Sequence, residues 1–259
     1  MAEPAAAPVL VSATDRIAAI TLNRPDRLNA LTPESTALLA ETLELAAGDE
    51  SVRVITITGA GRGFCAGADL AGGIQNASSD LIDVLNRIAT TICGAPKPVV
   101  ALLNGPAVGA GASLALACDL TVAAAGAYLK PGFEAIGLMP DGGGTAFWTA
   151  ALGRSAALRA LLLGDALPVE DAHRLGVIAE VHPAEEFEAA ADRVVRRLAA
   201  GPTRAYAATK QAVNGVALSG LATALAYERE QQLRLLGSDD FAEGLAAFAE
   251  KRPPRFQGR

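Results

Sequence analysis

Residues 62–70 read Arg62-Gly63-Phe64-Cys65-Ala66-Gly67-Ala68-Asp69-Leu70, a glycine-rich segment between an expected strand and an expected helix. The preceding run, Val52–Thr58, is rich in β-branched residues and has the length of a strand. The glycines let the backbone bend sharply and come close to a ligand. A helix that begins here leaves N–H groups without partners at its positive dipole end. The segment therefore predicts a place for negative charge, either a phosphate or the oxygen of an activated carbonyl.

The details of this segment argue against a nucleotide-binding loop. A Walker A motif requires Gly-Lys followed by Ser or Thr, which this chain does not contain. A dinucleotide fingerprint requires glycine at its sixth position, where the run from Gly59 has Phe64. An activated carbonyl is the better-matched ligand, and a plain tight turn is the alternative interpretation.

A second segment has the same order of a strand followed by a turn of small residues. The expected strand Val99–Leu103 leads into a turn of small residues, Asn104-Gly105-Pro106-Ala107-Val108-Gly109-Ala110-Gly111-Ala112-Ser113. Two turns of this kind, each after a buried strand, can converge on one oxygen and form an oxyanion hole. The alternative is two tight packings of a helix on a strand.

A serine hydrolase is the competing enzyme class. Residues 111–115, Gly111-Ala112-Ser113-Leu114-Ala115, come close to the Gly-x-Ser-x-Gly motif, but the final glycine is missing. Only His173 and His182 are available as a base. We therefore expect Ser113 to be a helix-packing residue.

Acidic residues that could move a proton occur in one further segment. Asp141 stands between Pro140 and three glycines that precede an expected helix. Its carboxylate could simply cap that helix. In an apolar pocket it would instead have a raised pKa and could transfer protons. Glu134, seven residues earlier, is the other acidic group within reach.

The order of expected elements indicates an α/β protein. Strands and helices alternate up to about Gly142, beginning with the paired strands Val9–Ser12 and Ile17–Leu22. After Gly142 nearly every segment has helical character, interrupted by one short strand at Val177–Val181. This order predicts a wound, largely parallel sheet with right-handed crossovers, followed by a helical region.

Composition excludes several classes of function. The 259 residues carry a net charge of −6, which argues against nucleic-acid binding through a basic face. No apolar run reaches the roughly 18 residues of a membrane span, and the first eight residues have no signal-peptide pattern. Three separated cysteines and two histidines give little basis for a metal site. We expect reduced thiols in a cytoplasmic protein that binds neither nucleic acid nor membrane.

Taken together, several motifs of the chain resemble the enoyl-CoA hydratase/isomerase, or crotonase, superfamily. The resemblance runs from about Val9 to Arg259. The motifs lie in residues 22–31 (Leu-Asn-Arg-Pro-Asp-Arg-Leu-Asn-Ala-Leu), 64–70, 104–119, 136–143 (Ile-Gly-Leu-Met-Pro-Asp-Gly-Gly) and 238–254. Each motif is weak alone, but the set is highly specific.

The resemblance implies a crotonase (ClpP-like) fold, an α/β spiral of ββα turns with a C-terminal helical trimerisation region. Residues 1–8 would be a flexible tail, 9–200 the spiral core and 201–259 the oligomerisation region of a homotrimer or a dimer of trimers. The substrate would be a coenzyme A thioester, with no other cofactor, and its oxygen would lie between the amides of Ala68 and Ala110. The residues implied in CoA binding are Arg27, Leu28, Ala66, Asp69, Leu70, Phe248 and Lys251, the last two across a subunit interface.

The chain departs from the hydratases of this superfamily at two positions. Those enzymes use two glutamates to activate water, and the matching residues here are Ser113 and Phe133. Members similar to ring-opened phenylacetyl-CoA isomerases also lack the pair and use an aspartate at the position of Asp141. The resemblance therefore favours double-bond isomerisation. A hydratase that uses Asp141 or Glu134, and a weakly catalytic CoA-binding scaffold, are the alternatives.

Overall fold

The computed structural model describes residues 7–70 and 78–259, and its main feature is a six-stranded sheet. The strand order is β1-β2-β3-β4-β6-β9, in which β1 is antiparallel to β2 and every other neighbouring pair is parallel. The strands are β1 (Val9–Thr14), β2 (Ile17–Leu22), β3 (Val54–Gly59), β4 (Val99–Leu103), β6 (Leu120–Ala124) and β9 (Glu180–His182). The predicted largely parallel sheet, with its first two strands paired, is confirmed.

A smaller sheet lies beside the first and was not expected from the sequence. It joins β5 (Ala107–Val108), β7 (Tyr128–Lys130) and β8 (Leu167–Pro168). The predicted strand at 177–181 was wrong in its bounds, since β9 covers Glu180–His182. Val177 and Ile178 instead donate their N–H groups to the Ala172 carbonyl and close the end of helix α6 (Val169–Arg174).

Helices cover both faces of the main sheet, so its central strands are apolar on both sides. Helices α1 (Pro33–Gly48), α2 (Ser79–Gly94) and α3 (Ala110–Ala117) pack on the face that carries Ile55. Helix α7 (Ala184–Ala200) packs on the opposite face against Val54. The alternation between neighbouring strand residues thus follows the two-residue period of a strand.

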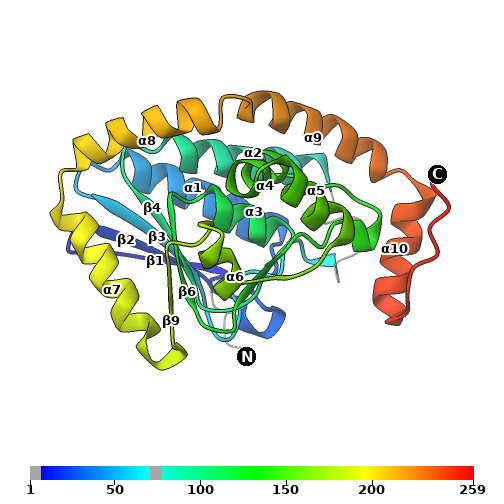
Figure 1. Ribbon diagram of the computed structural model, residues 1–259, viewed down its shortest axis with the longest axis horizontal. Coiled ribbons are helices and arrows are strands. Elements are labelled where there is room, and N and C mark those ends of the chain that lie inside the picture. The colour runs from blue at the N-terminus through cyan, green and yellow to red at the C-terminus, as the bar shows by residue number, and fades with distance from the viewer. Residues whose placement is uncertain (1–6, 71–77) are drawn as a thin grey trace, which may run out of the picture.

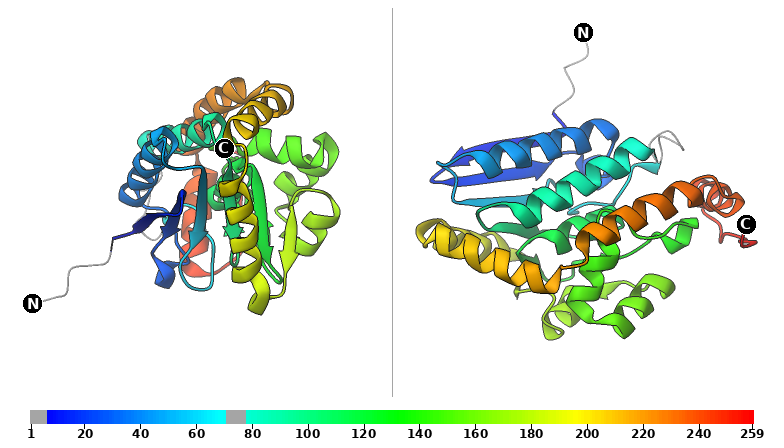
Figure 2. Two further views of the ribbon diagram at one scale, coloured as in Figure 1. Left: turned by 90° about the vertical axis from the view of Figure 1, so that its left-hand side faces the viewer. Right: turned by 90° about the horizontal axis from the view of Figure 1, so that it is seen from above.

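The remaining helices form the predicted helical region. They are α4 (Gly144–Leu152), α5 (Arg154–Leu163), α8 (Thr203–Ala217), α9 (Leu221–Leu235) and α10 (Asp239–Glu250). Figure 1 shows α8 and α9 as a long arc over the core, and both contact α2. Seen from above, this arc crosses the molecule to α10 at the C-terminal end (Figure 2). None of the helices in the described ranges is long and apolar enough to span a bilayer.

Helix α8 is tied to the core by a buried lysine. The Lys210 ammonium lies 2.8 Å from Asp119 Oδ2 and donates to the Ile92 carbonyl at 2.5 Å. The Asp119 carboxylate in turn accepts from the Val99 N–H at 2.7 Å. This network joins α8, the end of α2 and the start of β4.

The turns that follow β3 and β4 are joined by backbone hydrogen bonds. The N–H groups of Phe64 and Cys65 donate to the Pro106 carbonyl at 3.0 and 3.2 Å, and Val108 N–H donates to the Cys65 carbonyl at 2.9 Å. Helix α3 then packs so closely on this turn that a Cβ atom on Gly111 would lie 2.3 Å from the Cys65 oxygen. Only glycine fits at this contact.

This contact predicts a large effect of Gly111→Ala. The added methyl group meets a backbone oxygen, so the helix or the turn must move, at a cost of about 1–3 kcal/mol in the free energy of unfolding. Gly94→Ala is the matched control, because nothing lies within 4 Å of a Cβ at that helical position. The midpoints of urea unfolding measure both effects. Equal midpoints for the two variants would contradict the packing described.

Candidate active site

Ala68 and Ala110, one from each turn, lie close together at this junction. Ala68 follows Gly67, and Ala110 is the first residue of α3. A Cβ atom on Gly67 would lie 3.4 Å from the Ala110 nitrogen, so the two turns are in direct contact. Gly67 and Gly109 have φ of +84° and +57°, conformations that favour glycine. The structure therefore brings together the two residues that the sequence singled out as oxyanion-hole donors.

Both N–H groups are left out of the surrounding hydrogen-bond pattern. Leu31 pairs with the groups on either side of Ala68: its N–H donates to the Gly67 carbonyl at 2.7 Å, and its carbonyl accepts from Asp69 N–H at 2.9 Å. Ala110 lies in the first turn of α3, where N–H groups have no intrahelical acceptor. Within residues 7–70 and 78–259, neither N–H donates to a protein acceptor. Two adjacent donors of this kind can bind one oxygen that carries negative charge.

A small apolar pocket begins at Ala110. Side chains of α2 and α3 form most of its wall, and the loop before α4 closes it. The lining residues are Leu85, Ile88, Ala89, Ala110, Ser113, Leu114, Ala117 and Gly142. The pocket lies next to Ala110, whose N–H has no acceptor among the described residues, and an apolar wall beside such a donor suits an apolar chain on a carbonyl carbon.

Asp141 is buried next to this pocket, beside the lining residue Gly142. Asp141 is only 6% exposed, and its Oδ2 accepts a hydrogen bond from Gln232 Nε2 at 3.0 Å. Oδ1 is buried and has no hydrogen-bond partner among the described residues. Burial raises the pKa of Asp141 to about 7, opposed by the Gln232 hydrogen bond and assisted by the charge of Glu228. Such a carboxyl group exchanges protons readily near neutral pH.

The alternative role for Asp141, as the cap of α4, is wrong. No side chain caps the helix from the Asp141 position. Glu228 of α9 takes that part: its carboxylate accepts from Gly143 N–H at 2.7 Å and from Thr145 N–H at 2.8 Å. Burial raises the pKa of Glu228, which is fully buried. The Asp141 carboxylate therefore has no capping contact, and its Oδ1 has no hydrogen-bond partner among the described residues.

Sequence reasoning missed both Glu228 and Gln232. They share the buried side of α9 with Leu225. Polar side chains on an otherwise apolar helical stripe were the available signal, because a buried polar group requires a partner.

The positions that match the two glutamates of the hydratases hold residues of other kinds. Ser113 lines the pocket, is 3% exposed, and its hydroxyl has no hydrogen-bond partner in the described part of the chain. Phe133 is buried, and its ring lies 4.0 Å from a Cβ placed on Gly109. Neither side chain can serve as a general base for water.

Glu134 lies in a different direction from Asp141. It begins the short 3-10 helix η4 (Glu134–Ile136), and its carboxylate packs against Gly164 at the end of α5. It is not among the residues that line the pocket. Asp141 does not line the pocket either, but it is adjacent in the chain to the lining residue Gly142, whereas Glu134 is not. Glu134 Oε2, like Asp141 Oδ1, is buried without a hydrogen-bond partner among the described residues.

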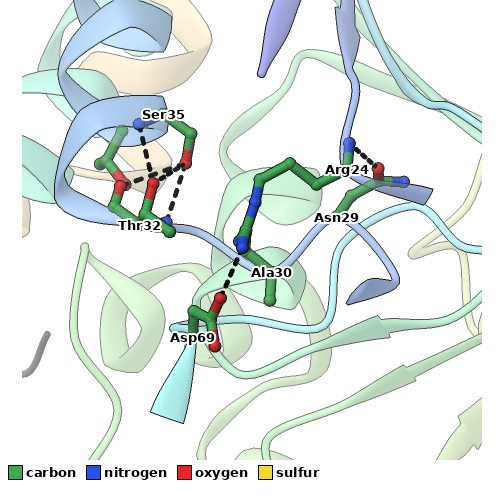
Figure 3. A network of polar contacts seen from close by, with 7 residues as sticks. Arg24, Asn29, Ala30, Thr32, Ser35 and Asp69 are labelled. Carbon is green, nitrogen blue, oxygen red and sulfur yellow. Dashed lines mark hydrogen bonds and ion pairs between the residues drawn. The ribbon is translucent and has the colours of Figure 1, made fainter. Parts of the chain in front are cut away.

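Five of the residues implied in CoA binding gather around one loop. Arg27 is exposed at the end of the 3-10 helix η1 (Pro25–Arg27), and Leu28 accepts a hydrogen bond from Ala66 N–H at 2.9 Å. Leu70 is partly buried. Asp69 forms an ion pair with Arg24, at 2.7 Å (Figure 3). Arg24 also donates to the Ala30 carbonyl, so this pair fixes the loop to the segment before α1.

Phe248 and Lys251 lie elsewhere, at the end of α10. Phe248 is 62% exposed, and Lys251 ends the helix with φ of +55°. Helix α10 packs on η4, where a Cβ on Gly244 would lie 2.6 Å from the Ile136 Cα. Within this single chain, both residues stand apart from the loop of Arg27 and Asp69.

Comparison with known proteins agrees with this arrangement. The sequence model of the enoyl-CoA hydratase/isomerase family matches residues 12–259. The chain is 40% identical to the 1,2-epoxyphenylacetyl-CoA isomerase of Escherichia coli K12, over 93% of this chain and 94% of that protein. It is also 40% identical to a probable enoyl-CoA hydratase of Rhodobacter capsulatus, over 95% and 96% of the two chains.

Solved structures give the same result for the fold. The crystal structure of an enoyl-CoA hydratase from Mycobacterium avium subsp. paratuberculosis K-10 superposes with a TM-score of 0.92 at 44% identity, covering 97% of this chain and 99% of that one. Sequence, fold and the placement of the two turns therefore agree, and the chain belongs to the enoyl-CoA hydratase/isomerase family, with the crotonase fold.

Proposed function

We propose that this protein is an enoyl-CoA double-bond isomerase with Asp141 as its proton carrier. The observation that carries the proposal is the buried Asp141 carboxyl group beside the apolar pocket, with Oδ1 unpartnered among the described residues. Ser113 and Phe133, at the positions of the hydratase glutamates, supply no acid in its place. One carboxylate and two N–H donors suffice to remove a proton and return it to another carbon.

The reaction follows from these groups. The thioester oxygen of a 3-enoyl-CoA binds to the N–H groups of Ala68 and Ala110. The Asp141 carboxylate takes a proton from C2, and the electron pair of that C–H bond forms an enolate whose charge lies on the thioester oxygen. The two N–H donors stabilise this charge, each by about 3 kcal/mol. The protonated Asp141 then returns the proton at C4, and the double bond moves from C3–C4 to C2–C3.

The CoA moiety is proposed to bind along the loop that contains Arg27, Leu28, Ala66, Asp69 and Leu70. Phe248 and Lys251 would reach the CoA of a neighbouring subunit in a homotrimer or a dimer of trimers. Large apolar side chains exposed on α8 and α9 support an assembly of this kind, since contact between subunits would remove their apolar surface from water. They are Val213, Val216 and Tyr227, which are 57%, 83% and 60% exposed. The proposal requires no cofactor beyond the CoA that the substrate carries.

Hydration of a 2-enoyl-CoA is the second candidate. The relative from Rhodobacter capsulatus, which is called a probable enoyl-CoA hydratase, favours it. In this reaction Asp141 or Glu134 would activate water for addition to C3. The two candidates differ in which substrate is turned over and in which carboxylate is required.

The substitution Asp141→Asn tests the proposed proton carrier. We expect the rate of 3-enoyl-CoA isomerisation to fall on the order of 10²–10⁴-fold, because the amide cannot accept the proton. Glu134→Gln is the matched control and should keep the isomerase rate. Both variants are also assayed for 2-enoyl-CoA hydration. Full isomerase activity in Asp141→Asn would refute the proposal, and hydration that depends on Glu134 would favour the second candidate.

The pH dependence of the reaction is a second test. Burial raises the pKa of Asp141 to about 7, and only the deprotonated carboxylate can take the proton from C2. We therefore expect kcat/KM for isomerisation to increase with pH, with a midpoint at about pH 7, and to level off about one pH unit higher. The profile is measured with a 3-enoyl-CoA in buffers of constant ionic strength. A rate that stays constant across this pH range would be inconsistent with Asp141 as the base.

A further inference from the structure

The hydrogen bond from Gln232 to Asp141 links the candidate catalytic group to a distant part of the chain. We propose that Gln232 is a positioning residue: it holds Oδ2 of Asp141, so that Oδ1 is the oxygen that takes and returns the proton. This inference rests on the proposed function of Asp141. It extends that function by assigning a role to α9, a helix of the C-terminal region.

The orientation of the Gln232 amide is fixed by its other contact. Met139 N–H donates to Gln232 Oε1 at 3.2 Å, while Gln232 Nε2 donates to Asp141 Oδ2 at 3.0 Å. A flipped amide would place Nε2 against the Met139 N–H and Oε1 against the carboxylate, and both contacts would be unfavourable. Gln232 is 2% exposed, so water does not compete for either contact. The side chain therefore presents a donor, and not an acceptor, to Asp141.

Helix α9 holds the Asp141 loop on both sides. Gln232 binds Met139, before Asp141 in the chain. Glu228, one helical turn earlier on α9, binds Gly143 and Thr145, after it. The loop is thus anchored at three peptide N–H groups by two side chains of one helix. With Oδ2 occupied as well, the carboxyl group has little freedom to rotate.

The charged groups around Asp141 determine how a substitution of Gln232 changes the pKa of Asp141. Glu228 is the titratable group that faces Asp141 from α9, and its negative charge raises the pKa of Asp141. Leu85 of α2 and Ser113 of α3, which pack near the loop, are uncharged. The Gln232 hydrogen bond lowers the pKa of Asp141 and so opposes Glu228. Loss of this bond should favour the protonated, inactive form of the base.

The experiment compares the pH profiles of two variants with that of the wild type. In Gln232→Leu the donor is lost, so the midpoint of the kcat/KM profile for 3-enoyl-CoA isomerisation should move up by about 1–2 pH units. Activity at pH 7 should then fall by about 5–50-fold and recover largely at higher pH. Gln232→Glu keeps the shape and the contact to Met139 but adds a second carboxylate beside Asp141. The midpoint of the kcat/KM profile of Gln232→Glu should move up at least as far as that of Gln232→Leu.

The controls separate this inference from the proposed function. Gln231→Leu alters the neighbouring α9 residue, which makes no side-chain hydrogen bond within the described ranges, and should leave the midpoint unchanged. A uniform loss of rate with an unchanged midpoint in both Gln232 variants would show a merely structural role and overturn the inference. If Asp141→Asn kept full isomerase activity, the proposed function would fail instead, whatever the Gln232 profiles show.

Discussion

The backbone of residues 63–67 lies directly against the start of α3, and the arrangement of the site depends on this contact. Gly67 and Gly111 permit it, because a Cβ at either position would lie within 3 Å of a backbone oxygen of the other turn. The contact brings Ala68 close to Ala110, and Ala110 lines the pocket. The neighbouring parallel strands β3 and β4 bring the turns to the same sheet edge, and the small residues allow the final approach.

Three of the buried charges in the described part of this protein follow a simple electrostatic rule. Lys97 donates to the Ala46 and Asp49 carbonyls at the end of α1, and Lys210 donates to the Ile92 carbonyl near the end of α2. Glu228 accepts from the N–H groups at the start of α4. Each charge thus opposes the partial charge of a helix end. Buried Asp69 instead pairs with Arg24, and Asp141 has one oxygen without any partner in the described part of the chain.

Much of the site could be predicted from local sequence, and the rest could not for a physical reason. The turns at Ala68 and Ala110 and the loop of Asp141 could be recognised because each of these residues is adjacent in sequence to glycine. Short strands such as β5 and β8 have two residues each and show no periodicity that could reveal them. Gln232 was missed because its partner lies 91 residues away, and no local pattern encodes that contact. The roles of these residues in catalysis stay predictions.

The distance along the chain between Asp141 and Gln232 has a consequence for biosynthesis. A ribosome completes the sheet strands β1 to β6 and the Asp141 loop well before it makes α9, since 91 residues separate the carboxylate from its amide partner. Until α9 is made, the Asp141 loop lacks the two side chains, Glu228 and Gln232, that hold it. The contacts that fix this loop can therefore be completed only after the C-terminal helix α9 has been made and has docked.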